Sequence, residues 1–76
     1  MDIELIGTVG VLAVGTRGAD GPGEVLLHVR GASESYLAYS DETIPRGTAV
    51  LVVEVRTARA VVVVRFDGPR TPSPLV

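Results

Sequence analysis

The sequence lacks helical periodicity and instead shows valine-rich segments separated by glycine and proline. No window longer than two turns places apolar residues at helical spacing without Gly, Pro or a β-branched run intervening. Valine-rich runs bounded by such turn residues are typical of β-strands. We therefore predict an all-β fold with strands at residues 5–14, 24–30, 34–39, 48–56 and 59–66.

Length limits this fold to one small domain with a single core. A chain of 76 residues buries only about 60–65% of the surface that it exposes when unfolded, which leaves a stability of roughly 3–5 kcal/mol. Residues 67–76 contain Pro69, Pro72 and Pro74, and proline cannot donate to a strand ladder. We expect the domain to cover residues 1–66 and the rest to form a flexible proline-rich tail.

Five short strands in a chain of this size, with a long first strand and a connection between the third and fourth, favour an OB-fold. This fold is a five-stranded Greek-key barrel, and an SH3-like barrel is the alternative. The glycine-rich loop 15–23 should join the first two strands as a hairpin, and the connection 40–47 has room for a brief helical turn. The last two strands should meet either in a tight turn at Thr57 and Ala58 or in a four-residue loop 56–59. The tight turn would pair Val55 with Ala60 and therefore Val52 with Val63.

Composition excludes several classes of protein. The chain has no Cys, so it has no disulfides and no thiolate chemistry, and all seven of its basic residues are Arg. A net charge of -2 argues against a surface that follows nucleic-acid phosphates. The uncharged stretch 5–16 is too short for a membrane helix, and acidic residues stand where a signal peptide needs positive charge. We expect a soluble, cytoplasmic chain without direct membrane insertion.

No set of residues has the spacing of a catalytic or metal site. His28 is the only histidine, no Gly-x-Ser-x-Gly elbow is present, and its alternation with apolar neighbours predicts a solvent-facing strand position. The loop 15–23 has neither GxGxxG spacing nor a following helix that could bind phosphate. Asp41 and Glu42 fall in a polar loop. We therefore predict no enzyme activity, no catalytic residue, no cofactor and no metal.

The order of several short motifs resembles the C-terminal domain of the NfeD family. The stretch 44–55, Ile-Pro-Arg-Gly-Thr-Ala-Val-Leu-Val-Val-Glu-Val, is similar to the family pattern I-x-x-G-x-x-V-x-V-V-x-V. The resemblance covers residues 6–66. Its other supporting residues are Gly7, Gly10, Pro22, Gly23, Glu24, Val25, Gly31, Ala38 and Ser40.

The resemblance implies a non-catalytic, bacterial protein-interaction domain that works with flotillin- or stomatin-like (SPFH) membrane scaffold proteins and reaches a membrane through such a partner. Family members usually carry transmembrane helices, and some carry a protease domain with a Ser-Lys dyad. The chain resembles the barrel alone and contains no Lys, so protease activity is not implied.

The alternative function is the general OB-fold activity of binding single-stranded nucleic acid or an oligosaccharide across the second and third strands. Such binding needs exposed aromatic residues interleaved with positive charge. Tyr36 and Tyr39 have opposite parity on the third strand, so at least one should be in the core, and Arg30 is the only basic residue in these two strands. We expect no nucleic-acid binding.

Charged residues in the last two strands predict which side faces solvent. If Glu54, Arg59 and Arg65 face outward and the strands are regular, alternation places a group of valines outward beside them. Exposed apolar clusters usually mark interfaces, so these residues form a predicted contact surface for a partner or for self-association through the fourth and fifth strands. The outward valines are Val50, Val52, Val61 and Val63, and the inward residues are Ala49, Leu51, Val53, Val55, Ala60, Val62, Val64 and Phe66.

Overall fold

The computed structural model describes residues 5–66, which form five strands and one short 3-10 helix. The expected tail, 67–76, lies outside the described residues. Glycine or proline occurs in every connection except the β4–β5 turn, and valine is abundant in the strands, as β propensity favours. In chain order the elements are β1 (Val9–Val14), η2 (Gly18–Asp20), β2 (Gly23–Val29), β3 (Ala32–Tyr39), β4 (Ala49–Thr57) and β5 (Ala60–Arg65).

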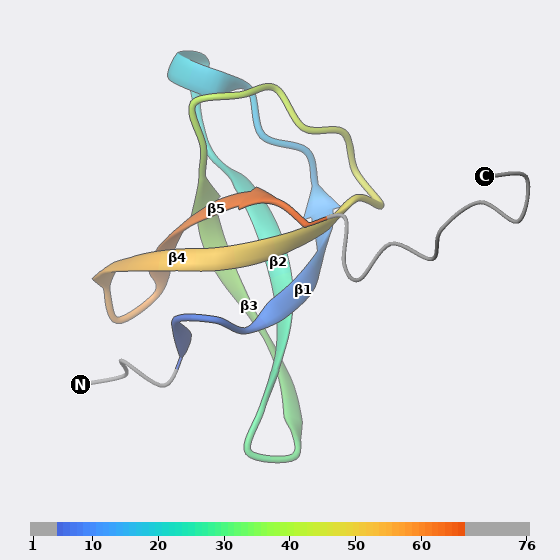
Figure 1. The fold of residues 1–76 in the computed structure, drawn as a ribbon, viewed down its shortest axis with the longest axis vertical. Helices are drawn as coiled ribbons and strands as arrows, with labels where there is room; N and C mark the ends of the chain where they lie inside the picture. The colour runs from blue at the N-terminus through green and yellow to red at the C-terminus, as the bar shows by residue number, and fades with distance from the viewer. Residues whose placement is uncertain (1–4, 67–76) are drawn as a thin grey trace, which may run out of the picture.

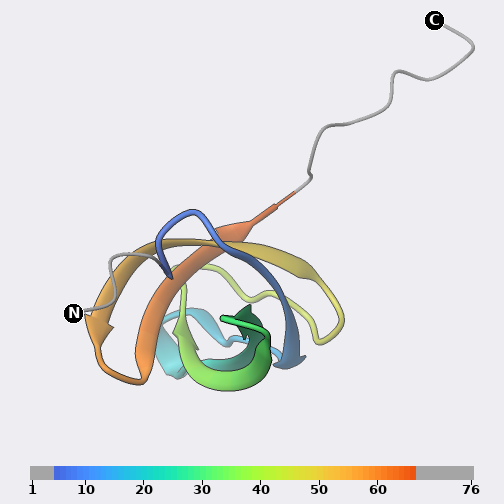
Figure 2. The same cartoon turned by 90° about the horizontal axis from the view of Figure 1, so that it is seen from below.

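The strands close into a barrel in the order β1-β2-β3-β5-β4, with β4 returning to pair with β1 (Figures 1 and 2). All neighbouring pairs are antiparallel except β3 and β5, which run parallel. Because β3 and β5 run parallel, a crossover connection must join them. This connection consists of the segment 40–48, β4 and the β4–β5 turn. This order is the Greek-key arrangement of an OB-fold, so the predicted fold class is confirmed.

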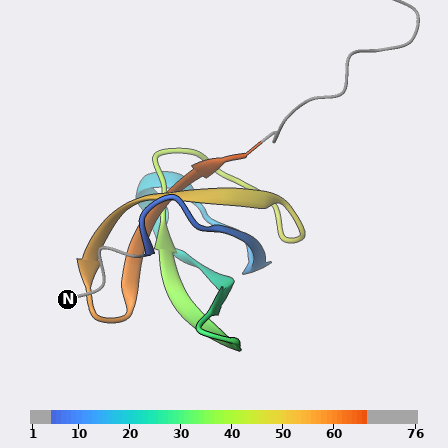
Figure 3. The same ribbon diagram turned by 60° about the horizontal axis from the view of Figure 1, so that its bottom comes forward.

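One local prediction was wrong in position. The first strand begins at Val9 rather than at residue 5, because a turn precedes it: the Thr8 N–H donates to the Leu5 carbonyl at 3.0 Å, and Gly7 has a φ of 92°. The connection 40–47, which had room for a brief helical turn, forms no helix, and η2 lies in the loop between β1 and β2. The β2–β3 and β4–β5 turns project from the barrel as separate loops (Figure 3).

The predicted outward orientation of four valines in β4 and β5 was also wrong, whereas Ala60 is buried as predicted. Val52 pairs with Val63 as expected, but the turn uses Ala58 and Arg59, and irregularities in β4 at Val53 and Arg56 shift the register. A bulge reverses the side of the sheet that later residues face. Glu54 is therefore exposed while Val52, two positions earlier, is buried. The predicted outward valines Val50, Val52, Val61 and Val63 are all 0% exposed and belong to the core.

The core fills the barrel with aliphatic side chains from every strand. Leu12 of β1, Val25 and Leu27 of β2, and the four valines of β4 and β5 pack together. Leu5 and Ile44 cover this cluster from outside the strands and are almost fully buried. Because the inward positions are saturated with apolar residues, other apolar side chains of the strands must face solvent.

Candidate protein-interaction surface

An uncharged group of aliphatic side chains covers one side of the barrel. Val9 and Val11 of β1, Leu26 of β2 and Val64 of β5 are exposed, with exposed fractions between 39% and 48%, and Leu51 of β4 is half-buried. We call these five residues the aliphatic face. They come from four strands that are consecutive in the barrel, β2, β1, β4 and β5 (Figure 1).

Strand register makes the aliphatic face continuous. Val9 pairs with Leu51 and Leu51 pairs with Val64, so these three side chains form one row across β1, β4 and β5. Val11 pairs with Leu26 across β1 and β2. Directly paired residues on one side of a sheet have Cβ atoms about 5 Å apart, which is contact distance for aliphatic side chains. The face is therefore one surface rather than isolated exposed residues.

The structure does not bring the charged residues of the predicted interface together. Glu54 is exposed and pairs with Val62 in the β4–β5 register. Arg59 lies in the β4–β5 turn, and Arg65 lies at the opposite end of β5. The four predicted valines are inside the barrel, so the predicted interface is not present as a surface.

Arg59 is held by Glu34 on β3. Its Nη1 donates to Glu34 Oε1 at 2.7 Å, and its Cζ lies 5.2 Å from the centre of the Tyr36 ring. The hydrogen bond and the charge of Glu34 raise the pKa of Arg59 above its usual value. This residue stays charged and links the β4–β5 turn to the start of β3.

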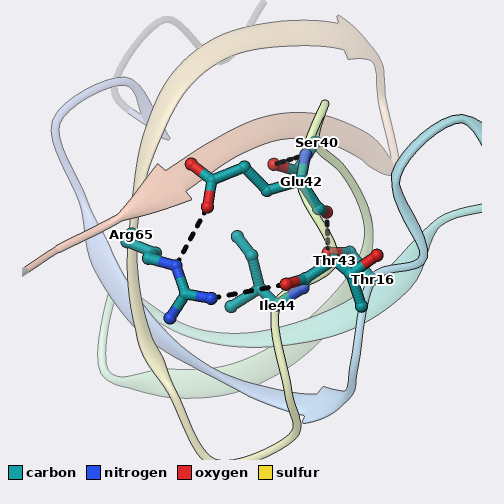
Figure 4. A network of polar contacts seen from close by, with 6 residues as sticks. All are labelled: Thr16, Ser40, Glu42, Thr43, Ile44 and Arg65. Carbon is teal, nitrogen blue, oxygen red and sulfur yellow. Dashed lines mark hydrogen bonds and ion pairs between the residues drawn. The ribbon is translucent and has the colours of Figure 1, made fainter.

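A polar network closes the end of the barrel near the 40–48 connection (Figure 4). The Thr16 hydroxyl donates to the Glu42 carbonyl at 2.7 Å and accepts from the Ile44 N–H at 2.9 Å. Arg65 donates from Nε to Glu42 Oε1 at 3.0 Å and from Nη2 to the Thr43 carbonyl at 3.3 Å. Ile44 lies amid these contacts and is fully buried. The network thereby fixes the loop after β3 to the loop after β1.

Replacing Thr16 with valine should loosen this end of the barrel. Thr16 is 2% exposed, and Val keeps its shape but leaves the Glu42 carbonyl without its hydroxyl donor. We expect a loss of about 1–3 kcal/mol in the free energy of unfolding, measured by urea denaturation followed by circular dichroism. Thr57→Val is the control, because the Thr57 hydroxyl is exposed and accepts only from the Arg59 N–H. Equal losses in the two variants would contradict a structural role for the network.

The described residues contain no cluster that could hold a metal, and an arginine lies over each tyrosine ring. Residues 5–66 contain no group of three or more His, Cys, Asp or Glu that could hold a metal. His28 is exposed, as predicted, with Nδ1 3.5 Å from the Ser33 hydroxyl. Tyr36 is 6% exposed and in the core, as the parity argument required, and the guanidinium of Arg56 covers Tyr39 with Cζ 4.6 Å from the ring centre. Tyr36 is therefore buried, and a guanidinium covers one face of Tyr39.

Sequence reasoning missed the aliphatic face, although β1 carried a signal for it. Gly10 points into the barrel, where a Cβ would lie 2.6 Å from Leu27 Cδ2. A glycine that is required by close approach marks the inward side of a strand. Its neighbours Val9 and Val11 must then face outward, and strand pairing extends this orientation to β4.

Family comparison identifies the domain. The NfeD C-terminal domain family matches residues 9–64, the whole of the barrel from β1 to β5 except the last residue of β5. The chain belongs to this family. The resemblance seen in the sequence is thus confirmed, and the NfeD domain of this chain is an all-β, closed five-stranded barrel.

Two solved structures are similar to this NfeD domain. The soluble domain of the NfeD protein YuaF from Bacillus subtilis is 30% identical, with a TM-score of 0.72 over 86% of this chain and 77% of that one. The C-terminal domain of a stomatin operon partner protein from Pyrococcus horikoshii is 27% identical, with a TM-score of 0.64 over 86% of this chain and 92% of that one. No curated protein sequence matches the chain. Within residues 5–66, no helix has the length and apolar character needed to cross a membrane.

Proposed function

We propose that this NfeD domain is a non-catalytic interaction domain that binds a stomatin- or flotillin-like (SPFH) protein, in the cytoplasm and at the membrane that holds this partner. The main support for this proposal is that the chain belongs to the NfeD C-terminal domain family and that a similar structure is named a stomatin operon partner protein. An adaptor needs a binding surface and no reactive centre. The aliphatic face described above can serve as such a binding surface.

The aliphatic face is the best candidate for the binding surface. Continuous exposed apolar surface usually marks an interaction site, and the interior of a protein interface is poor in charged residues. All five residues of the face are aliphatic, and the nearest outward acidic positions, Glu24 on β2 and Glu54 on β4, lie along its margin. The face thus has the apolar centre and charged rim of a binding surface. A second copy of the domain that bound through β4 and β5 would cover Leu51 and Val64 of this face.

Substitutions in the aliphatic face test this proposal. The stomatin-like protein of the same source, without its membrane anchor, is titrated against the NfeD domain by calorimetry, after the mass of the free domain has been measured by ultracentrifugation. We expect Val9→Lys and Val64→Lys each to weaken binding about tenfold or more, which corresponds to 1.4 kcal/mol. Leu37→Lys is the matched control, since Leu37 is 42% exposed but lies on β3, outside the face.

Binding that is unchanged in the Val9 and Val64 variants would exclude the aliphatic face. Absence of binding by the unmodified domain would exclude this partner. A dimer that both face variants convert to a monomer would assign the face to self-association instead. Circular dichroism of each variant separates loss of binding from loss of fold.

A further inference from the structure

A hollow of about 310 Å³ opens beside the aliphatic face, where two loops meet the barrel. Segments distant in sequence form it: the loop that carries η2, the end of β3 and its following loop, and one residue each from β4 and β5. The Gly18 N–H donates to the Glu42 carbonyl at 3.2 Å, which holds the two loops together. The lining residues are Gly18, Ala19, Gly21, Tyr39, Ser40, Asp41, Arg56 and Val62.

Arg56 supplies an oriented positive charge in this hollow. Its guanidinium lies over Tyr39 at 4.6 Å, an arrangement that fixes a planar cation while leaving its N–H edges free to donate. Within the described residues, Arg59 pairs with Glu34 and Arg65 pairs with Glu42, but Arg56 has no carboxylate partner. Its hydrogen-bonding capacity is available to a ligand.

A second guanidinium lies close by. Arg17 packs against Gly21 of the hollow, so that a Cβ on Gly21 would lie 3.0 Å from Arg17 Nη2. Arg17 likewise has no acidic partner among residues 5–66. One unpaired guanidinium lines the hollow and a second lies beside its Gly21. In a chain with a net charge of -2, this arrangement favours an anionic ligand group.

The other polar groups favour one carboxylate on a peptide over a phosphate. Asp41 lines the same hollow and repels a phosphate dianion about twice as strongly as a single carboxylate. Its own carboxylate can accept from a peptide N–H. The Ser40 hydroxyl accepts from the Glu42 N–H at 3.1 Å, so its proton remains free to donate. Arg56 covers Tyr39, which leaves that ring poorly placed for a nucleic-acid base.

We infer that this hollow binds an aspartate or glutamate side chain of an extended partner segment that has aliphatic neighbours. The inference rests on the proposed function, since it describes the partner of an interaction domain. Continuity with the aliphatic face specifies the neighbours: Val62 lines the hollow, and Val64 is the next outward residue of β5. An acidic residue in the hollow therefore places the residue beside it over the aliphatic face.

Peptide titrations followed by NMR test this inference without the partner protein. The probes are acetyl-Val-Glu-Val-amide and its glutamine counterpart, added to isotope-labelled domain at low salt. We expect the glutamate peptide to bind with a dissociation constant of roughly 1–10 mM and the glutamine peptide to bind about tenfold more weakly. The glutamate peptide should shift the amide signals of Gly18, Gly21, Ser40 and Val62. Arg56→Gln should weaken binding of the glutamate peptide about tenfold, whereas Arg59→Gln, the control, should not change it.

Several results would overturn the inference. Three results would each show that the hollow is not a carboxylate site. They are equal binding of the two peptides, shifts confined to other residues, and no shift when the peptide is in 20-fold excess over about 1 mM domain. A single-stranded oligonucleotide that shifts the same signals more strongly than the peptide would assign the hollow to phosphate. If the peptides do not bind but the stomatin-like protein does, only this inference is rejected. If the peptides bind but the stomatin-like protein does not, only the proposed partner is rejected.

Discussion

Val61→Glu combined with Val63→Glu is expected to unfold the domain. Both side chains are 0% exposed inside the barrel, and the structure provides no cation beside them in the core cluster, which consists of aliphatic residues, Ala38 and Tyr36. Burying an unpaired carboxylate costs several kcal/mol, or forces its protonation at a similar cost. Two such groups exceed the roughly 3–5 kcal/mol that a domain of this size has available.

Val64→Glu is the matched control for this prediction. Val64 lies on the same strand and is 39% exposed, so its substitution should change the free energy of unfolding by no more than about 1 kcal/mol. Far-UV circular dichroism and thermal melting measure both variants. A double variant that keeps its β spectrum and a cooperative melt would show that these valines face outward, as the sequence alone suggested.

The sequence predicted the strands well because their signals are local. Valine content and punctuation by Gly and Pro place all five strands to within a few residues, and the Val52–Val63 pair was correct. The predicted orientation of side chains in β4 and β5 was wrong for three separate reasons. The bulge at Val53 separates the exposed Glu54 from the buried Val52, Arg59 belongs to a turn, and Arg65 has the parity of the core residues.

Arg65 shows why parity alone is insufficient at a strand end. It pairs with the buried Val50, yet its side chain is exposed and reaches Glu42 and Thr43 at the end of the barrel. A long side chain can carry its charge to the surface from an inward position. This arrangement depends on the position of the 40–48 connection, which supplies the partners of Arg65. No local sequence pattern specifies that position.

The candidate sites differ in how far sequence could have located them. The aliphatic face follows from Gly10 and strand alternation in β1, once the pairing of β1 with β4 is known. The hollow depends on contact between the η2 loop and the loop after β3, which are about 20 residues apart in the chain. No motif in either loop predicts that contact, so this hollow required the structure.

Gly10→Ala is expected to destabilise the domain by about 3 kcal/mol through crowding inside the barrel. An added Cβ would overlap the Leu26 carbonyl oxygen and lie 2.6 Å from Leu27 Cδ2 and 2.9 Å from Val25 Cγ2. The two side chains can shift only within a filled core. The carbonyl can shift only by disturbing the pairing of β1 with β2, because Leu26 is paired with Val11.

Gly31→Ala separates this crowding from the general cost of replacing glycine. Gly31 has a φ of 82°, and an added Cβ there would meet no atom within 4 Å, so its substitution carries only a backbone penalty of about 1 kcal/mol. Urea denaturation of the two variants should give a loss at Gly10 at least twice that at Gly31. If Gly10→Ala were as stable as the unmodified domain, β1 could not approach β2 as closely as the structure has it, and the outward placement of Val9 and Val11 would lose its support.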